Sequence, residues 1–174
     1  MSKNLLIVGA GMYADVAAEI AQSMNCFEKI GFLDDERKST PCGRVVVGKI
    51  SDIEEFASKY ENAVVAIGNP KTRLSLLNVL KKTNLYRIVS LVSPQAYVAP
   101  SVKMLEGCIV EPMAVVHAGC ELFSGCIVSA GAVINHASIC EEGVHIDCNA
   151  TVEGYSHVPS KMKICCGEVY KNIR

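Results

Sequence analysis

Large apolar residues recur at every sixth position in the second half of the chain, from Val98 to Ile164. A small residue usually follows four positions after each of them, as at Cys108, Ala114 and Cys126. A fixed period of this kind is typical of a solenoid, in which each repeat buries its apolar face only by stacking on its neighbours. Three hexads make one turn of a triangular prism, so residues eighteen positions apart are expected to stack. The large apolar positions are Val98, Met104, Val110, Val116, Leu122, Val128, Ile134, Cys140, Ile146, Val152, Val158 and Ile164.

The chain before residue 93 follows a different pattern, because short apolar runs alternate with segments of helical spacing. Strands that alternate with helices at this spacing predict a parallel sheet that is covered on both faces. We therefore expect a Rossmann-like α/β domain over residues 1–92 and a β-prism domain over residues 93–174. The expected strands cover residues 3–8, 29–33, 62–67 and 87–91, and one expected helix begins at Pro70.

A glycine-rich turn follows the first expected strand, with the sequence Gly9-Ala10-Gly11-Met12-Tyr13-Ala14. Such a GxGxxA turn presents backbone N–H groups and a helix N-terminus to a phosphate. Asp34 or Asp35, about twenty residues further on, is placed to meet a ribose hydroxyl or a base edge. A domain of this size has room for half of a dinucleotide fold, which favours a nucleotide or nucleotide-sugar ligand over NAD. A dinucleotide-dependent oxidoreductase and a tight turn without a ligand remain the alternatives.

A second strand end, Ala66-Ile67-Gly68-Asn69-Pro70, points to the same edge of the expected sheet. Ligands of open parallel sheets gather at the carboxyl ends of the strands, so Gly68 and Asn69 are candidates to line the same crevice. Asn69 also stands where it can cap the helix that begins at Pro70, and we favour this role over ligand contact.

Composition and charge exclude several classes of function. Four of the nine cysteines, Cys108, Cys120, Cys126 and Cys140, fall on inward positions where a thiol acts as a small apolar filler. No CxxC pair is present, so we expect no metal. Seventeen basic and eighteen acidic side chains leave no basic stripe for nucleic acid. Neither a signal peptide nor a membrane-spanning run is found, and we expect a cytoplasmic protein.

His136 is the most interesting of the four histidines. Its expected stacking neighbours, Ala118 and Gly154, are small and leave open space around the ring, as a general base requires. Asn135 is expected to stack between His117 and Glu153, which forms a polar column beside His136. An outward histidine is otherwise an ordinary solvated residue.

Over about residues 3–158 the chain resembles the sugar O-/N-acetyltransferases of bacterial sialic acid and bacillosamine pathways. The matching pieces are Gly9-Ala10-Gly11, Gly31-Phe32-Leu33-Asp34-Asp35, Ala66-Ile67-Gly68-Asn69, and Asn135-His136 followed nine residues later by His145. The resemblance implies a homotrimer with an N-terminal nucleotide-sugar domain and a C-terminal left-handed parallel β-helix of about four turns. It also implies direct acetyl transfer from acetyl-CoA to an amine or hydroxyl of a nucleotide-linked sugar.

The resemblance assigns roles to individual residues. His136 matches the general base and His145 matches a residue that contacts acetyl-CoA. Gly11, Met12 and Tyr13 match the loop that holds the sugar nucleotide, while Asp34 and Asp35 match the positions that read its base and ribose. In a trimer the cleft lies between neighbouring subunits.

The chain departs from the family pattern in three places, and two of them, Ala137 and the short prism, motivate an alternative: a catalytically silent trimeric protein that only binds nucleotide sugars. Ala137 replaces the acid that usually follows the catalytic histidine, so Glu153 becomes the first candidate to orient the ring. Met12-Tyr13 replaces a glycine-histidine pair. Pro159, Lys161, Met162 and Glu168 are expected to end the prism early. Trimer formation has a separate argument in the outward apolar residues Ile109, Val115, Ile127, Val133 and Ile139, which are expected to form one stripe.

Overall fold

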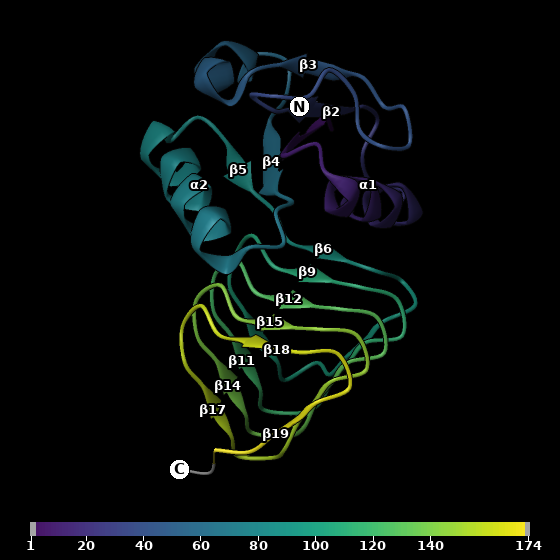
Figure 1. Ribbon diagram of the computed structural model, residues 1–174, viewed down its shortest axis with the longest axis vertical. Coiled ribbons are helices and arrows are strands. Elements are labelled where there is room, and N and C mark those ends of the chain that lie inside the picture. Colours follow the sequence, from purple (N-terminus) through teal and green to yellow (C-terminus); the bar gives the residue numbers. More distant parts are fainter. Residues whose placement is uncertain (1–2, 173–174) are drawn as a thin grey trace. The chain divides into compact units, whose positions relative to one another are not determined.

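The computed structural model describes residues 3–172 and divides the chain into two compact units, one ending at Val89 and the other beginning at Ser90. The N-terminal unit is an α/β domain and the C-terminal unit is a left-handed parallel β-helix (Figure 1). The fold class is therefore the one predicted from the sequence. None of the helices within the described range is long and apolar enough to cross a bilayer.

The N-terminal unit is built on a parallel sheet with the strand order β3-β2-β1-β4-β5. Leu6 and Val8 of β1 pack with Leu77 and Leu80 of α2, while Leu5 and Ile7 point to the opposite face and are equally buried. Burial on both faces explains why the strands consist of continuous apolar runs. The elements are β1 (Leu5–Val8), α1 (Met12–Ser23), β2 (Ile30–Leu33), β3 (Val46–Gly48), a 3₁₀ helix η1 (Ile50–Phe56), β4 (Asn62–Val65), α2 (Pro70–Thr83) and β5 (Arg87–Ile88).

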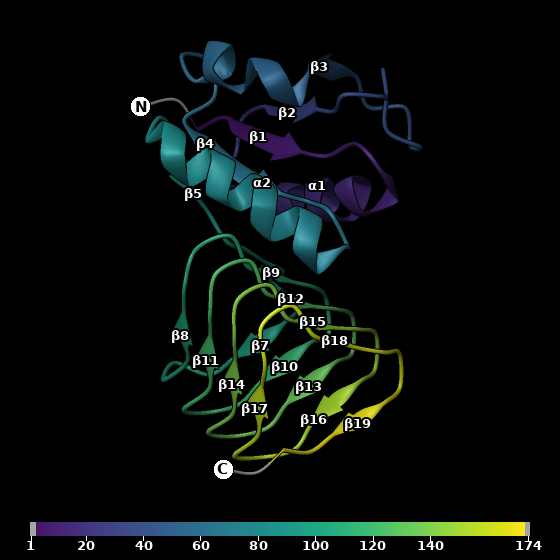
Figure 2. The ribbon, with the colours of Figure 1, turned by 60° about the vertical axis from the view of Figure 1, so that its left-hand side comes forward.

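The β-helix consists of two-residue strands that form the three sheets of a prism, as Figures 1 and 2 show. One sheet contains β6 (Leu91–Val92), β9 (Ile109–Val110), β12 (Ile127–Val128), β15 (His145–Ile146) and β18 (Lys163–Ile164). A second contains β7 (Tyr97–Val98), β10 (Val115–Val116), β13 (Val133–Ile134), β16 (Thr151–Val152) and β19 (Val169–Tyr170). The third contains β8 (Lys103–Met104), β11 (Glu121–Leu122), β14 (Ile139–Cys140) and β17 (His157–Val158).

The predicted stacking of residues eighteen positions apart is confirmed. Val98 pairs with Val116, Val116 with Ile134, and Ile134 with Val152 in successive turns. The large and small inward residues form one continuous core, in which Cys108, Cys120, Cys126 and Cys140 are buried as expected. The hexad period is therefore set by the need to fill a narrow triangular interior.

The fourth position of each hexad carries a signal that the sequence analysis missed. From Gly107 to Gly167 this position has a positive φ in every hexad, and glycine occupies it in about half of them. The exceptions include Ala137, with φ 55°, where a side chain is held in the left-handed region at a cost of about 1–2 kcal/mol. The left-handed residue makes the sharp corner between two faces of the prism.

The two ends of the β-helix differ in detail from the expected pattern. The expected strand 87–91 is divided, because Arg87–Ile88 pairs with β4 whereas the Leu91 N–H donates to the Cys108 carbonyl inside the β-helix. The expected β-helix of about four turns is confirmed, but Pro159, Lys161 and Met162 do not interrupt it, since β18 and β19 continue the coil. Irregular side chains are tolerated there because the coil is held by backbone hydrogen bonds.

The predicted apolar stripe is also wrong, because its members lie on three different faces. Ile109 and Ile127 belong to β9 and β12 and are fully buried. Val115 and Val133 belong to the second sheet, and Ile139 to the third. Consecutive hexads occupy consecutive faces, so residues six positions apart cannot form one stripe.

Candidate active site

Three loops meet at the carboxyl edge of the N-terminal sheet, because β1 lies between β2 and β4. The chain moves to one side of β1 through β2 and returns to the other side at β4, which makes β1 and β4 a topological switch point. Ligands of open α/β sheets bind at such a point. The loops after these strands contain Gly11 and Gly68, two of the sequence-predicted binding residues.

Gly9 and Gly11 of the first loop have different structural roles. Gly9 has a φ of 108°, and a Cβ atom there would lie 3.0 Å from Ile67 Cγ1 and 3.1 Å from the Ala66 carbonyl oxygen. A Cβ atom on Gly11, the residue before α1, would meet nothing within 4 Å. Gly9 is thus needed for the turn itself, while Gly11 leaves open space in front of the helix N-terminus.

The two residues after Gly11 differ in exposure. Met12 is 60% exposed, and Tyr13 is half-buried. Both lie in the first turn of α1. Phosphate binding at this turn stays a prediction, and Met12 is the side chain that solvent reaches beside it.

Asp34 holds the glycine loop rather than projecting from it. Its Oδ2 accepts a hydrogen bond from the Ala10 N–H at 2.8 Å, and its Oδ1 accepts from the Glu36 and Arg37 N–H groups at 3.0 and 2.9 Å. Burial raises the pKa of this carboxyl, but the three backbone donors outweigh burial and hold the pKa below its usual value. Asp34 therefore organises the loop on which the predicted nucleotide site depends.

The lowered pKa of Asp34 predicts a pH dependence of stability. A group with a depressed folded-state pKa stabilises the fold above its unfolded pKa of about 3.9, and this contribution disappears as the pH falls through the folded value. We expect Asp34→Asn to unfold at lower urea concentration than the wild type at pH 6, with the difference shrinking steadily below pH 4. A difference that stays constant down to pH 2 would contradict the charged role.

The side chains of Asp35 and Asn69 both accept hydrogen bonds from backbone N–H groups. Asp35 Oδ1 accepts from the Ile50 N–H at 2.9 Å at the start of η1. Asn69 caps α2, because its Oδ1 accepts from the Lys71 and Thr72 N–H groups at 3.0 and 3.1 Å. The capping role that we favoured for Asn69 is what the geometry shows.

The sequence analysis missed two charged residues that are buried in this domain. Arg73 is fully buried, and its Nη1 donates to the carbonyl oxygens of Ile67 and Gly68 at 2.8 and 2.9 Å. Asp15 in α1 accepts from Thr40 Oγ1 at 2.6 Å and from the Cys42 N–H at 3.0 Å. Both residues hold loops at the carboxyl edge of the sheet in place. Their burial could have been inferred from the sequence, because each places a charge on the apolar face of its helix.

His136 lies at the exposed corner of the β-helix that follows β13. Its ring stands above Gly154, where a Cβ atom would come within 3.0 Å of Cε1 and 3.1 Å of Nε2. The ring of Tyr155 meets it edge-on, with centroids 5.0 Å apart and an interplanar angle of 89°. The space that was expected to stay open beside Gly154 is thus filled by the His136 ring, and Tyr155 packs on the ring edge-on.

Asn135 orients the imidazole. Asn135 Oδ1 lies 2.8 Å from His136 Nδ1 and also accepts from the His136 backbone N–H at 2.9 Å. Because this oxygen can only accept, Nδ1 carries the proton in the neutral ring and Nε2 keeps its lone pair. His136 is thus set in the tautomer that a general base requires.

Glu153, the candidate that we had expected to orient His136, is engaged elsewhere. Its Oε2 lies 3.0 Å from Lys171 Nζ, in the next turn of the coil. The expectation is wrong because Asn135 is adjacent to His136 and its short side chain folds back onto the ring.

His145 lies apart from His136 within one chain. It belongs to β15, is 6% exposed, and its Nε2 lies 3.1 Å from Ser129 Oγ. Nine residues are half of an eighteen-residue turn, so the two histidines point from different sides of the prism. Within one subunit the structure does not bring these two predicted site residues together.

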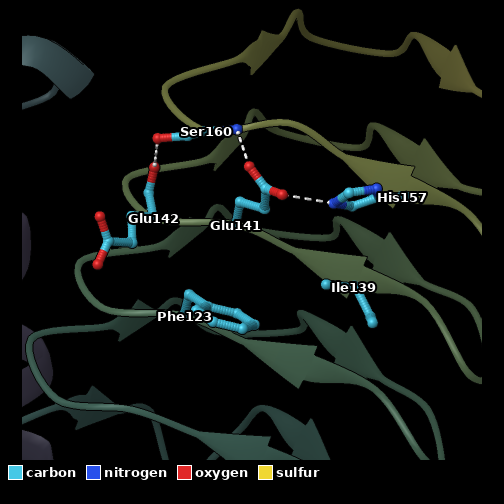
Figure 3. A pocket seen from close by; sticks show the side chains of 6 residues that line it. All are labelled: Phe123, Ile139, Glu141, Glu142, His157 and Ser160. Atoms are coloured by element: carbon cyan, nitrogen blue, oxygen red, sulfur yellow. Dashed lines mark hydrogen bonds and ion pairs between the residues drawn. The ribbon is translucent and has the colours of Figure 1, made fainter.

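A carboxylate–histidine pair that the sequence analysis missed lies in a cavity of about 360 Å³ on the third face (Figure 3). Glu141 Oε1 lies 2.7 Å from His157 Nε2, and Glu141 Oε2 accepts from the Ser160 N–H at 2.9 Å. Phe123 and Ile139 form the apolar part of the lining. The pairing was not predictable because the two residues are sixteen positions apart and meet only through the coil.

No group of three or more potential metal ligands occurs within residues 3–172.

The chain is similar to known proteins along most of its length. Residues 4–80 match the family described as the PglD N-terminal domain. The acetyltransferase domain of PglB from Neisseria gonorrhoeae, solved with acetyl coenzyme A, is 28% identical, with a TM-score of 0.90 over 97% of this chain and 82% of that chain. The N-terminal unit therefore matches a PglD N-terminal domain, and the matches together support an acetyltransferase of the hexapeptide β-helix type.

A more distant structure shares the fold of this acetyltransferase. A variant of perosamine N-acetyltransferase from Caulobacter crescentus, solved with CoA and GDP-perosamine, is 22% identical, with a TM-score of 0.78 over 98% of this chain and 89% of that chain. A search of curated protein sequences finds no match. The acetyltransferase therefore combines a recognised N-terminal domain with a β-helix that carries His136 at an open corner.

Proposed function

We propose that this acetyltransferase transfers the acetyl group of acetyl-CoA directly to an amine or hydroxyl of a nucleotide-linked sugar, with His136 as the general base. The observation that carries the proposal is the 2.8 Å contact between Asn135 Oδ1 and His136 Nδ1, because it leaves Nε2 as the proton acceptor of an exposed ring. The gonococcal relative solved with acetyl coenzyme A and the Caulobacter relative solved with CoA and GDP-perosamine support the choice of donor and acceptor class.

In the proposed reaction His136 Nε2 accepts a proton from the acceptor N–H or O–H group while that group attacks the thioester carbonyl. The C–S bond then breaks, and the departing thiolate of CoA takes the proton back from the imidazolium. A neutral amide at Asn135 orients the ring but gives the imidazolium less electrostatic stabilisation than a carboxylate would. Ala137, at the position of the family's acid, cannot add to it.

We place the nucleotide part of the substrate at the loop formed by Gly9 and Gly11. Open space in front of the α1 N-terminus and the Asp34 clamp support this assignment. The N-terminal end of α1, in front of which Gly11 leaves space, would meet a phosphate there. Gly68 faces the same edge and, like Gly11, leaves space beyond its Cα atom.

A homotrimer completes the proposed site. His136 and His145 lie half a turn apart, so one subunit cannot present both to one acetyl-CoA molecule. A neighbouring prism, rotated about a three-fold axis, can bring His145 opposite His136. Light scattering at micromolar concentration is expected to give the mass of a trimer, and a stable monomer with full activity would contradict the shared site.

The cytoplasm is the compartment that we infer for this protein. All nine cysteines are free in the structure, although Cys108 and Cys126 are in contact in successive turns. Free thiols in such number persist in a reducing compartment.

A direct assay separates the proposed enzyme from a silent nucleotide-sugar-binding protein. Purified protein is mixed with acetyl-CoA and a panel of UDP-, GDP- and CMP-amino sugars, and CoA release is followed. Turnover with at least one sugar supports the proposal. Binding of a nucleotide sugar in calorimetry, without acetyl-CoA binding or turnover, would favour the silent protein. The neutral residues Asn135 and Ala137 beside His136 are the reason to consider that alternative.

Substitution of Asn135 tests its orienting role. Asn135→Ala removes a hydrogen bond worth about 1–1.5 kcal/mol and should lower kcat about tenfold with little change in KM. Asn135→Asp supplies a carboxylate that stabilises the imidazolium, so the acidic limb of the pH–rate profile should move to higher pH. An unchanged profile in Asn135→Asp would show that residue 135 does not act through His136.

A further inference from the structure

Two cysteines that the proposed reaction does not use lie one above the other at a corner of the β-helix. Cys148 follows β15 by two residues, and Cys166 follows β18 by two residues. The register pairs Ile146 with Ile164, and the Gly167 N–H donates to the Cys148 carbonyl at 3.0 Å. The two cysteines therefore occupy the same position in successive turns.

Stacking in register brings these two residues to a distance at which a disulfide can form. Neighbouring strands lie about 4.8 Å apart, and disulfides join Cα atoms that are about 4.4–6.8 Å apart. The other stacked cysteine pair of the chain shows that the coil brings thiols together, because the Cys108 and Cys126 thiols share a hydrogen bond inside the prism. That pair is fully buried, whereas Cys166 is exposed and Cys148 half-buried.

The neighbouring Cys165 is a poor partner for either thiol. Its Cα atom is about 3.8 Å from that of Cys166 along the chain, which is shorter than the usual disulfide range. It stacks on Asp147 rather than on a cysteine, given the same register. Cys165 is therefore a matched control that has similar exposure but no stacked thiol.

We propose that Cys148 and Cys166 form a reversible dithiol–disulfide site that reacts with low-molecular-weight disulfides of the glutathione class. The exposed Cys166 thiolate attacks the disulfide of the oxidant, which forms a mixed disulfide and releases one thiol. Cys148 then attacks the Cys166 sulfur and releases the second thiol. Two protein thiols are oxidised and one disulfide is reduced to two thiols, so atoms and electrons balance.

The bond would close the last turn of the coil. β18 and β19 stand at the ends of their sheets and have a paired strand on one side only. A disulfide between residues 148 and 166 ties this terminal turn to the turn above it, which includes Glu153, Gly154 and Tyr155. Reduction releases the terminal turn again, so its opening becomes dependent on the redox state.

The test treats the intact chain with oxidised glutathione and maps its cysteines by mass spectrometry without reduction. We expect a Cys148–Cys166 cross-link, with glutathione alone on Cys26, Cys42 and Cys165. Cys148→Ser should stop the reaction at glutathione-modified Cys166, and Cys165→Ser should leave the cross-link unchanged. The cross-link should also raise the unfolding midpoint by about 5 °C or more, and reductant should reverse the shift.

Two outcomes would overturn the proposal. Glutathione-modified Cys166 beside a free Cys148 in the wild type would show that the thiols do not meet. A cross-link from Cys165 to Cys148 would show that the register does not select the pair. None of these measurements requires acetyl-CoA or a sugar, so they are independent of the proposed function.

Discussion

Replacement of His136 by alanine is expected to lower kcat for acetyl transfer by about 10²–10⁴-fold, the usual contribution of a positioned general base. The loss should fall on kcat rather than on KM, because in the proposed reaction the imidazole acts only on the proton of the acceptor and the glycine loop binds the nucleotide. His136→Ala should fold normally, since the side chain is exposed and its neighbours Gly154 and Tyr155 are anchored by the coil. CoA release under saturating acetyl-CoA and sugar is the measurement.

His157→Gln is the matched control for this experiment. His157 is also an outward histidine of the β-helix, and it is paired with the carboxylate of Glu141. Glutamine keeps a hydrogen-bond donor toward that carboxylate, so the variant should keep most of the activity. A loss in His157→Gln that matches the loss in His136→Ala, or unchanged turnover in His136→Ala, would remove His136 from the role of base.

Replacement of Ile134 by alanine is expected to lower the free energy of unfolding by about 2–5 kcal/mol, the range for truncation of a buried isoleucine. Ile134 is fully buried and stacks between Val116 and Val152 in the middle of the prism. Its neighbours are fixed by backbone hydrogen bonds to the turns on both sides, so they cannot move inward to fill the space. Urea unfolding followed by circular dichroism measures the loss.

Ile139→Ala makes the same truncation five residues later on the outside of the prism. Ile139 is half-buried and lines the cavity beside His157. It should lose clearly less stability than Ile134→Ala, because the alanine leaves no enclosed cavity. Equal losses in the two variants would contradict the assignment of inward and outward positions.

The hexad pattern was sufficient to predict the interior of the β-helix. Each inward residue is dictated by a narrow space that repeats every eighteen residues, so Val116, Ile134 and Val152 could be placed without coordinates. The same arithmetic was misapplied to the outer surface, where Ile109 and Val115 were assigned to one stripe although consecutive hexads occupy different faces. The information was present in the sequence and was not used.

The hydrogen-bond partners of the candidate site could not be predicted in this way. Asn135 and Glu153 were both within reach of His136 in the sequence pattern, and the choice depended on side-chain rotamers. Asp34 stood at the position expected for ribose recognition, yet its oxygens are taken by backbone N–H groups of its own and the neighbouring loop. A polar side chain at a strand end can bind a ligand or hold the backbone of a loop. Which of the two it does depends on the path of the loop that follows the strand.

The eighteen-residue register limits how this β-helix can change in length. A deletion of six residues would keep every inward side chain inside but would move all later residues to the next face of the prism. Removal of a whole turn would preserve both the interior and the face of each remaining residue. Chains of this type are therefore expected to gain or lose length by complete turns, and a shorter indel would have to lie beyond the last residue whose face matters for the reaction.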